Sequence, residues 1–206
     1  MTSRKFLVCG PAPQKHTRGG LWIRPTKEGK LNMKSQNLRG LARNGLIAAA
    51  YAALSLALTP FTFGQVQCRV SEALTLLPVL CPSSVWGVTL GCVVTNLVGA
   101  SAGTNFLGIA DVFLGSAATL AAGLMTARLG KYRWKGLPVL ASLPPVLLNA
   151  IVVGGEWCYV MTGGLAPLPF LTFGGFIALG QLVSCCGLGL VMIYALEKSG
   201  ASRVLQ

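Results

Sequence analysis

Hydrophobic residues follow one another in long runs through most of this chain, and polar residues gather where the runs break. The runs extend from about Gly45 to Leu196, a stretch of about 150 residues. A helix needs about 20 apolar residues to cross a bilayer, so this stretch accommodates six crossings joined by short loops. The pattern therefore predicts an all-α integral membrane protein with six transmembrane helices.

Proline, glycine and polar clusters mark the ends of the predicted helices, because these residues interrupt apolar helices. The second predicted helix contains Pro78 and ends at Pro82, so we expect it to be short or kinked. The fifth is interrupted by Pro144 and Pro145. The six predicted spans cover residues 41–59, 70–82, 83–98, 111–128, 137–160 and 171–196.

The composition agrees with a membrane protein. Of the 206 residues, 53% are hydrophobic and only 11% are charged. Soluble domains carry about 25% charged residues, so this chain has too few of them to cover a soluble surface. The mean hydropathy of +0.64 points the same way.

The formal net charge of +12 is concentrated near the ends of the predicted helices. Lysine and arginine flank transmembrane helices on the cytoplasmic side. With six spans and a cytoplasmic N-terminus, nine of the ten basic residues from Met33 onward lie on that side, and only Arg69 lies outside. We therefore expect a multi-pass plasma-membrane protein with both termini in the cytoplasm. The basic residues then face a lipid bilayer, and we expect no nucleic-acid partner.

Residues 1–32 form a polar, basic segment that precedes the apolar runs. The segment lacks the apolar core of 7–15 residues that a signal peptide needs. Two interpretations stay open: a disordered tail, or an extension upstream of a natural start at Met33. Residues 33–206 then form the six-helix membrane domain.

The residues of the predicted bundle do not assemble a catalytic set. The seven cysteines show no CxxC spacing, and the single histidine, His16, lies in the basic N-terminal segment. Neither a phosphate-binding GxxxxGK[ST] motif nor a GxSxG motif occurs. We therefore expect a protein that is not an enzyme and that carries no metal and no cofactor.

The first predicted helix carries small residues in two neighbouring rows. One row contains Ala48 and Ala52, and the other contains Ala49 and Ala53 after Gly45. Small residues four positions apart let two membrane helices approach closely. The rows could pack inside this protein, or they could form a surface for a partner helix.

Three carboxylates lie at the predicted external ends of spans: Glu72, Asp111 and Glu156. Asn149 precedes Glu156 by two helical turns and shares its face, and Asn96 ends the third span on the same side. Each has a plain alternative: Asp111 could cap its helix, Glu72 could pair with Arg69, and Trp157 and Tyr159 could lie at the membrane interface. Together they predict an outward-facing pocket for a small polar ligand.

The excess of carboxylates favours a cationic ligand or one with several hydrogen-bond donors. A guanine-like edge presents two parallel N–H donors, which a carboxylate accepts with both oxygens. Aromatic side chains would stack on the face of a purine-like ring. Vitamin amines, amino acids and cationic drugs fit these residues equally well.

A family resemblance narrows the choice. The stretch SEALTLLP at Ser71–Pro78 resembles the signature of the QueT family, the queuosine-precursor S components of energy-coupling-factor (ECF) transporters. Further similar stretches occur in the same order, and the resemblance covers about Met33 to Glu197. These stretches are residues 45–52, 91–97, 111–120 and 143–150.

The resemblance implies a six-helix substrate-binding subunit that captures a 7-deazaguanine, with prequeuosine as the expected ligand, from outside the cell. It also implies partners: a transmembrane coupling protein and two ATPase subunits, with the small residues of the first helix as the coupling surface. The substrate-binding residues are then expected to be Arg69, Glu72, Asn96, Asp111, Asn149, Glu156, Trp157 and Gln181.

Gln181 departs from the family pattern, which usually has a glutamate there, and this leaves the exact substrate open. The alternative function is a stand-alone secondary carrier for a small cationic or vitamin-like solute, which would need its own coupling-ion site.

Overall fold

The structure, a computed structural model, describes residues 27–64 and 66–200, with the backbone alone for residues 27–37. The described residues form helices joined by short loops, and they contain no strand apart from one isolated bridge between Trp134 and Leu137. The helices are α1 (Lys27–Ala57), α2 (Thr59–Thr62), η1 (Val70–Val79), α3 (Ser84–Ser101), α4 (Ile109–Leu129), η2 (Val139–Ser142), α5 (Leu143–Thr162), α6 (Pro167–Gln181), η3 (Leu182–Gly189) and α7 (Leu190–Lys198).

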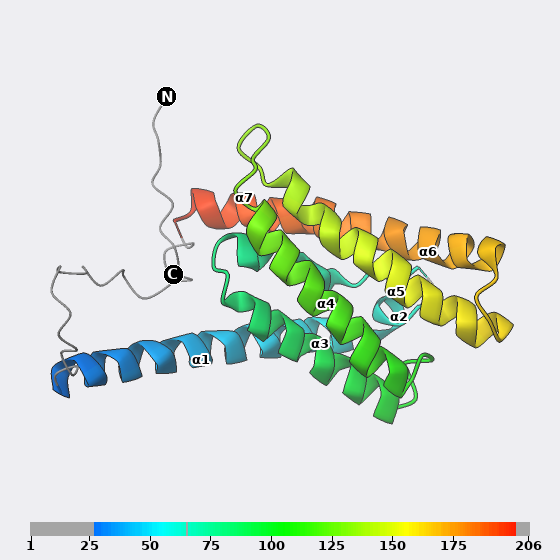
Figure 1. The fold of residues 1–206 in the computed structure, drawn as a ribbon, viewed down its shortest axis with the longest axis horizontal. Coiled ribbons are helices and arrows are strands. Elements are labelled where there is room, and N and C mark those ends of the chain that lie inside the picture. Colours follow the sequence, from blue (N-terminus) through cyan, green and yellow to red (C-terminus); the bar gives the residue numbers. More distant parts are fainter. Residues whose placement is uncertain (1–26, 65, 201–206) are drawn as a thin grey trace, which may run out of the picture.

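The long helices run up and down beside one another (Figure 1). Helix α1 packs on α3, α3 on α4, α4 on α5, and α5 on α6. The start of α1, the connection between α4 and α5, and the end of α7 lie at the same end of the bundle, on the left in Figure 1. The basic residues of these segments thus lie at one end, and the cytoplasmic side predicted for that end stays a prediction.

Among the described residues, four helical stretches are long and apolar enough to cross a membrane: Ser84–Ser101, Ile109–Leu129, Val139–Thr162 and Pro167–Lys198. They correspond to the third, fourth, fifth and sixth predicted spans. The first predicted span lies within α1, whose first half is polar. The second predicted span is shorter than a membrane-crossing helix needs to be, so the count of six transmembrane helices stays a prediction.

The second predicted span is a 3₁₀ helix, η1, rather than an α-helix. Runs of 3₁₀ helix longer than about four residues are uncommon, and ten residues at a rise of about 2.0 Å reach only about 20 Å of a 30 Å hydrocarbon core. Pro78 lies inside it and has no N–H to donate. Eight of its ten residues are buried, because α1, α3, α4 and η3 surround it.

One predicted domain boundary stays untested, and one predicted helix boundary differs from the structure. Helix α1 begins at Lys27, before Met33, and residues 1–26 of the predicted extension lie outside the described residues, so the domain boundary at Met33 stays a prediction. Helix α6 begins at Pro167 rather than Leu171, because proline is well suited to the first helical turn.

Helices α5 and α6 approach each other at two glycines. A Cβ atom on Gly154 would lie 2.7 Å from the Cα atom of Gly174, so neither position has room for a side chain. Small residues allow such close contact between membrane helices. The contact fixes the part of α5 that carries Glu156.

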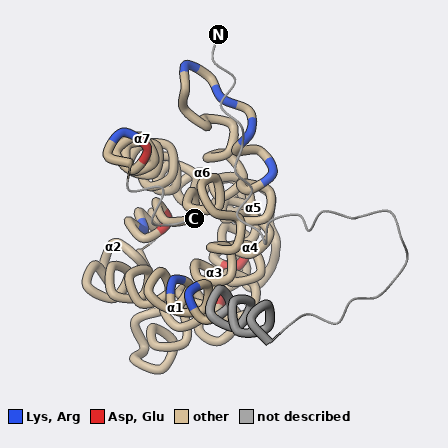
Figure 2. Tube along the Cα trace, turned by 90° about the vertical axis from the view of Figure 1, so that its left-hand side faces the viewer, with Lys and Arg blue, Asp and Glu red and all other residues tan. Residues whose placement is uncertain are grey.

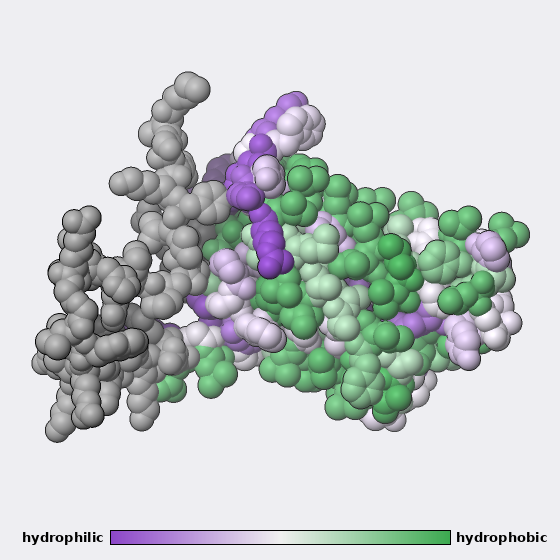
Figure 3. Space-filling view, viewed as in Figure 1, coloured by the Kyte–Doolittle hydropathy of each residue, from purple (hydrophilic) through white to green (hydrophobic). Residues whose placement is uncertain are grey.

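Apolar side chains cover most of the visible outer surface (Figure 3). Phe113, Leu168, Leu171 and Val191 are each more than 60% exposed, on three different helices. Polar side chains gather at the end where α4 joins α5. Such an outer surface suits lipid rather than water, and it identifies a membrane protein.

Candidate functional site

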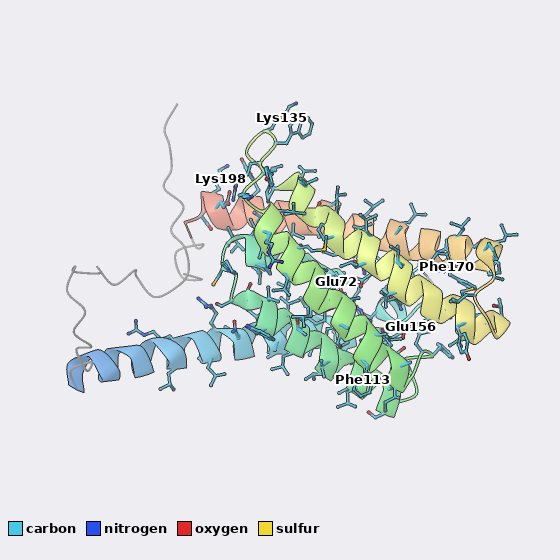
Figure 4. The ribbon with its side chains drawn as sticks, in the orientation of Figure 1. Glu72, Phe113, Lys135, Glu156, Phe170 and Lys198 are labelled. Atoms are coloured by element: carbon cyan, nitrogen blue, oxygen red, sulfur yellow. The ribbon has the colours of Figure 1, made fainter. Side chains whose placement is uncertain are left out.

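All eight predicted substrate-binding residues are buried inside the bundle. Their exposed fractions lie between 0% for Asn96 and 8% for Glu156. Figure 4 places Glu72 in the middle of the bundle and Glu156 toward the end that carries Phe170, with Lys135 and Lys198 at the opposite end. Buried charged groups are destabilising unless they are paired or serve a ligand, so their partners decide what this site does.

Glu72 lies in the first turn of η1 and is paired with a residue of α1. The hydroxyl of Tyr51 donates a hydrogen bond to Glu72 Oε1 at 2.6 Å. The other oxygen, Oε2, has no hydrogen-bond partner among the described residues. Glu72 and Arg69 form no direct ion pair among the described residues, although their charges lie close enough to interact. Arg69 instead donates its hydrogen bonds to other groups.

Arg69 starts a chain of hydrogen bonds that links η1 to α3 and α4. Its Nη2 atom donates to Asn96 Oδ1 at 3.2 Å, and its guanidinium lies 5.5 Å from the centre of the Phe63 ring. Asn96 Nδ2 donates to the backbone carbonyl of Asp111 at 2.9 Å. Asn105 Nδ2 donates to Asp111 Oδ2 at 2.8 Å.

The carboxylate of Asp111 takes part in this hydrogen-bond network and also lies in the first turn of α4. Gly108 is the N-cap, so Asp111 does not cap the helix from that position, but an acid in the first turn still stabilises a helix, and that alternative stays open. The side chain folds back along α4, and a Cβ atom on Gly115 would lie only 2.0 Å from Asp111 Oδ1. Gly115 thus leaves the space that this carboxylate occupies.

Glu156 is the polar group with the least support from the protein. Both carboxylate oxygens are buried, and neither has a hydrogen-bond partner in the part of the chain that the structure describes. Asn149 is buried two turns away on the same helix, as predicted. Asp111 is close enough to Glu156 for their charges to interact, which increases the need for a positive or donating partner.

Trp157 follows Glu156 on α5 and belongs to a cluster of aromatic rings. Its ring lies 6.1 Å from that of Phe173 in a stacked arrangement and 6.4 Å from that of Phe106. Trp157 is only 3% exposed, so the prediction of an interface position is wrong for it, whereas Tyr159 is 63% exposed. The indole Nε1 donor is buried and unpaired among residues 27–64 and 66–200.

Two further donors remain unused by the described residues: Arg69 Nε and Gln67 Nε2. Gln67 has a backbone φ of 41°, in the left-handed region, and its side chain is 3% exposed. The buried site thus combines three carboxylates with one guanidinium, and it has both free acceptors and free donors. A polar ligand with an excess of donors or a positive charge would complete it.

Gln181 lies at the end of α6, behind the Glu72 side of the site. Its Oε1 atom accepts a hydrogen bond from Cys185 Sγ at 3.3 Å, and the same sulfur lies 3.5 Å from the backbone carbonyl of Glu72. Its neighbour Gly180 lies against the turn before η1, where a Cβ atom would lie 2.1 Å from the carbonyl oxygen of Val66. Gln181 therefore supports η1 through the π-helix η3.

The two alanine rows of α1 differ in exposure. Ala48 and Ala52 are buried, and a Cβ atom on Gly91 of α3 would lie 3.0 Å from the Ala48 carbonyl oxygen. For this row, internal packing is the correct alternative, and the predicted coupling surface is wrong. Ala49 and Ala53 are exposed, so for them the coupling surface stays a prediction.

Sequence reasoning missed three residues of the site. Tyr51 lies within an apolar run, so its hydroxyl does not stand out in the sequence. The one signal is that Tyr51 shares a helix face with Ala48 and Ala52, which favours a buried position. Asn105 lay in a polar loop, and Gln67 in a predicted turn. Neither loop position carries a periodic signal, so only the folded chain reveals them.

The described residues contain no group of three or more histidine, cysteine or acidic side chains that could hold a metal ion. In a comparison with known protein families, the family described as QueT transporter matches residues 41–198. No curated protein and no solved structure matches the chain.

Proposed function

The chain belongs to the QueT transporter family, and on this basis we propose that it is the substrate-binding subunit of an ECF-type importer. In this proposal it captures a queuosine precursor, prequeuosine, at the outer side of the plasma membrane. A transmembrane coupling protein and two ATPase subunits supply the energy, and both termini of the chain lie in the cytoplasm.

The observation that carries the proposal is the buried carboxylate of Glu156, whose two oxygens lack partners among the described residues. A guanine-type edge offers N1–H and the N2 amino group in parallel, and this pair matches a carboxylate in the way that an arginine fork does. A secondary carrier would also need acidic groups, but it would not need a flat pair of acceptors beside an indole.

The cluster of aromatic rings supports a flat heterocyclic ligand. Trp157 stands next to Glu156 in sequence and is backed by Phe173 and Phe106. Base–aromatic stacking contributes about 1–3 kcal/mol per base.

The charge of the site supports a cationic substituent. Three buried carboxylates face one buried guanidinium, and Glu72 Oε2 has no donor from the described residues. The aminomethyl group of prequeuosine would bring a positive charge and several N–H donors. An uncompensated buried charge is strongly unfavourable. A ligand with a positively charged substituent should therefore bind these carboxylates more tightly than a neutral ligand.

The proposal is tested by uptake of labelled prequeuosine into proteoliposomes. The chain alone should bind the label but not accumulate it, and accumulation should require the coupling protein, both ATPases and ATP. Accumulation by the chain alone, driven by an ion gradient, would identify a secondary carrier instead. When the coupling protein and the two ATPases are co-expressed with the chain, they should co-purify with it.

A further inference from the structure

A tight hairpin connects α4 to α5 at the basic end of the bundle. Trp134 and Leu137 exchange both backbone hydrogen bonds, at 2.9 and 3.0 Å. The two residues between them have positive φ angles, 50° at Lys135 and 87° at Gly136. Positive values at both central positions define a type I′ turn, the usual connection of a two-residue hairpin.

A bidentate ion pair holds this hairpin on α7. Arg133 donates to both oxygens of Glu197, at 2.7 and 2.9 Å, and also to the Gly136 carbonyl oxygen at 3.0 Å. Bidentate arginine–carboxylate pairs fix geometry as well as charge. The hairpin is therefore positioned by the fold, and Glu197 is already engaged by Arg133.

The remaining charged groups of this surface are all basic. Lys131, Lys135 and Lys198 form no ion pair with a carboxylate of the described residues. Each ammonium instead lies over an aromatic ring on its own segment, at 5.1 Å from Tyr132, 4.9 Å from Trp134 and 5.8 Å from Tyr194. These lysines and rings, with the hairpin between them, are called the hairpin surface below.

The rings of the hairpin surface face outward rather than into the core. Tyr132 is 54% exposed, Trp134 is 67% exposed, and Tyr194 is 55% exposed. Tyrosine and tryptophan gather at the headgroup level of membranes, where one side of the ring is apolar and the other is wet. Exposed rings paired with lysines fit that layer better than they fit bulk water.

The direction in which the hairpin projects also suits a position in the headgroup layer. In Figures 1 and 2 it projects sideways from the bundle rather than continuing along the axis of α6 and α7. In Figure 3 its polar atoms rise beside the apolar surface of the bundle. A sideways projection at the end of membrane-crossing helices extends over the adjacent lipid headgroups.

We infer that the hairpin surface binds the headgroups of anionic phospholipids, with Lys131, Lys135 and Lys198 on the phosphates and Tyr132 and Trp134 in the headgroup layer. Charge complementarity decides the partner, because anionic lipids attract basic residues next to transmembrane helices. This inference needs only a membrane-embedded chain and does not depend on the identity of the transported ligand.

The test is native mass spectrometry of the purified full chain from nanodiscs that hold phosphatidylglycerol and phosphatidylcholine in equal amounts. The wild type should retain phosphatidylglycerol preferentially. The Lys131→Gln/Lys135→Gln variant should lower that retention at least about fivefold, because each lysine contributes to the attraction. The matched control, Lys131→Arg/Lys135→Arg, keeps both positive charges and should change retention less than twofold.

A second measurement uses the native tryptophan. The difference in fluorescence between the wild type and Trp134→Phe should be quenched by phosphatidylglycerol brominated near the headgroup. An unquenched difference, or equal lipid retention by the wild type and the lysine variant, would overturn the inference. Equal losses of lipid retention in the lysine variant and the control would overturn it as well. Loss of co-purifying subunits from the lysine variant, with lipid retention unchanged, would also overturn it and would indicate a protein partner.

Discussion

At the scale of single residues, the site depends on a few buried polar atoms that the protein itself does not satisfy. Glu156 has two such oxygens and Glu72 has one, counting partners among the described residues. An unsatisfied buried polar group costs about 1–3 kcal/mol, so several together would lower the stability of the empty protein. A ligand that supplies the missing donors would recover this stability, and this accounts for binding without any catalytic group.

Replacing Glu156 with glutamine should weaken prequeuosine binding by about 10- to 150-fold, because a charge-assisted hydrogen bond contributes about 1.5–3 kcal/mol. The amide keeps the shape of the side chain but replaces one acceptor with a donor. Glu197→Gln is the matched control, since Glu197 binds Arg133 at the opposite end of the bundle. Equilibrium binding decides between them, and an unchanged affinity for a folded Glu156→Gln would remove this residue from the site.

Gly115→Ala should destabilise the protein through Asp111. The new Cβ atom would lie 2.0 Å from Asp111 Oδ1 and 3.2 Å from Asn96 Nδ2, so the carboxylate must move away from Asn105. Overpacking of this kind costs about 1–3 kcal/mol. Thermal unfolding in detergent should show a lower Tm for this variant only.

The matched control is Gly175→Ala, a helical glycine with no neighbouring atom within 4 Å of the added Cβ. Alanine is favoured over glycine within helices by up to about 1 kcal/mol. The control should therefore keep or raise the Tm. If the Tm of Gly115→Ala equals that of the control, the Asp111 side chain can adopt another conformation without loss of stability.

At the scale of elements, the sequence predicted where the helices lie better than how they are built. Long apolar runs and prolines located the third to sixth spans within a few residues, because the thickness of the bilayer sets the length of a helix that crosses it. The 3₁₀ form of η1 could not be predicted. Its conformation depends on burial by α1, α3, α4 and η3, and no local pattern in residues 70–79 encodes that.

The candidate site was predicted in part for a similar reason. Charged residues in apolar runs are conspicuous in a sequence, so Glu72, Asp111 and Glu156 were found directly. Their partners Tyr51 and Asn105 lie on other elements, at separations of 21 and 6 residues. Residue types that are ordinary in their own segments gain a role only through such contacts.

The alanine rows of α1 separate a packing role from a coupling role. Ala49→Leu/Ala53→Leu should leave ligand affinity nearly unchanged and abolish uptake, because added bulk on the exposed row keeps a partner helix at a distance. Transport assays with the complete importer and binding assays with the chain alone give the two readouts.

Ala48→Leu/Ala52→Leu is the matched control for this experiment. These alanines are buried against α3, so leucines there should lower the thermal stability and the ligand affinity together. Normal uptake by the variant of the exposed row would contradict a coupling role for α1.

At the scale of the whole molecule, the two ends of the bundle have different chemistry. One end carries the basic hairpin and the end of α7, while Glu72 lies in the middle and Glu156 toward the other end (Figure 4). This separation suits the proposed role, in which the ligand binds near one membrane face and partners supply the energy.

The most direct test of the central claim is a calorimetric titration of the purified, monodisperse chain with prequeuosine, in the absence of ATP and of any partner. We predict saturable binding of one ligand per chain, weaker binding of the neutral 7-cyano-7-deazaguanine, and no binding of adenine, whose edge lacks the paired donors. No saturable binding of prequeuosine by the folded chain, or equal binding of adenine, would contradict the account.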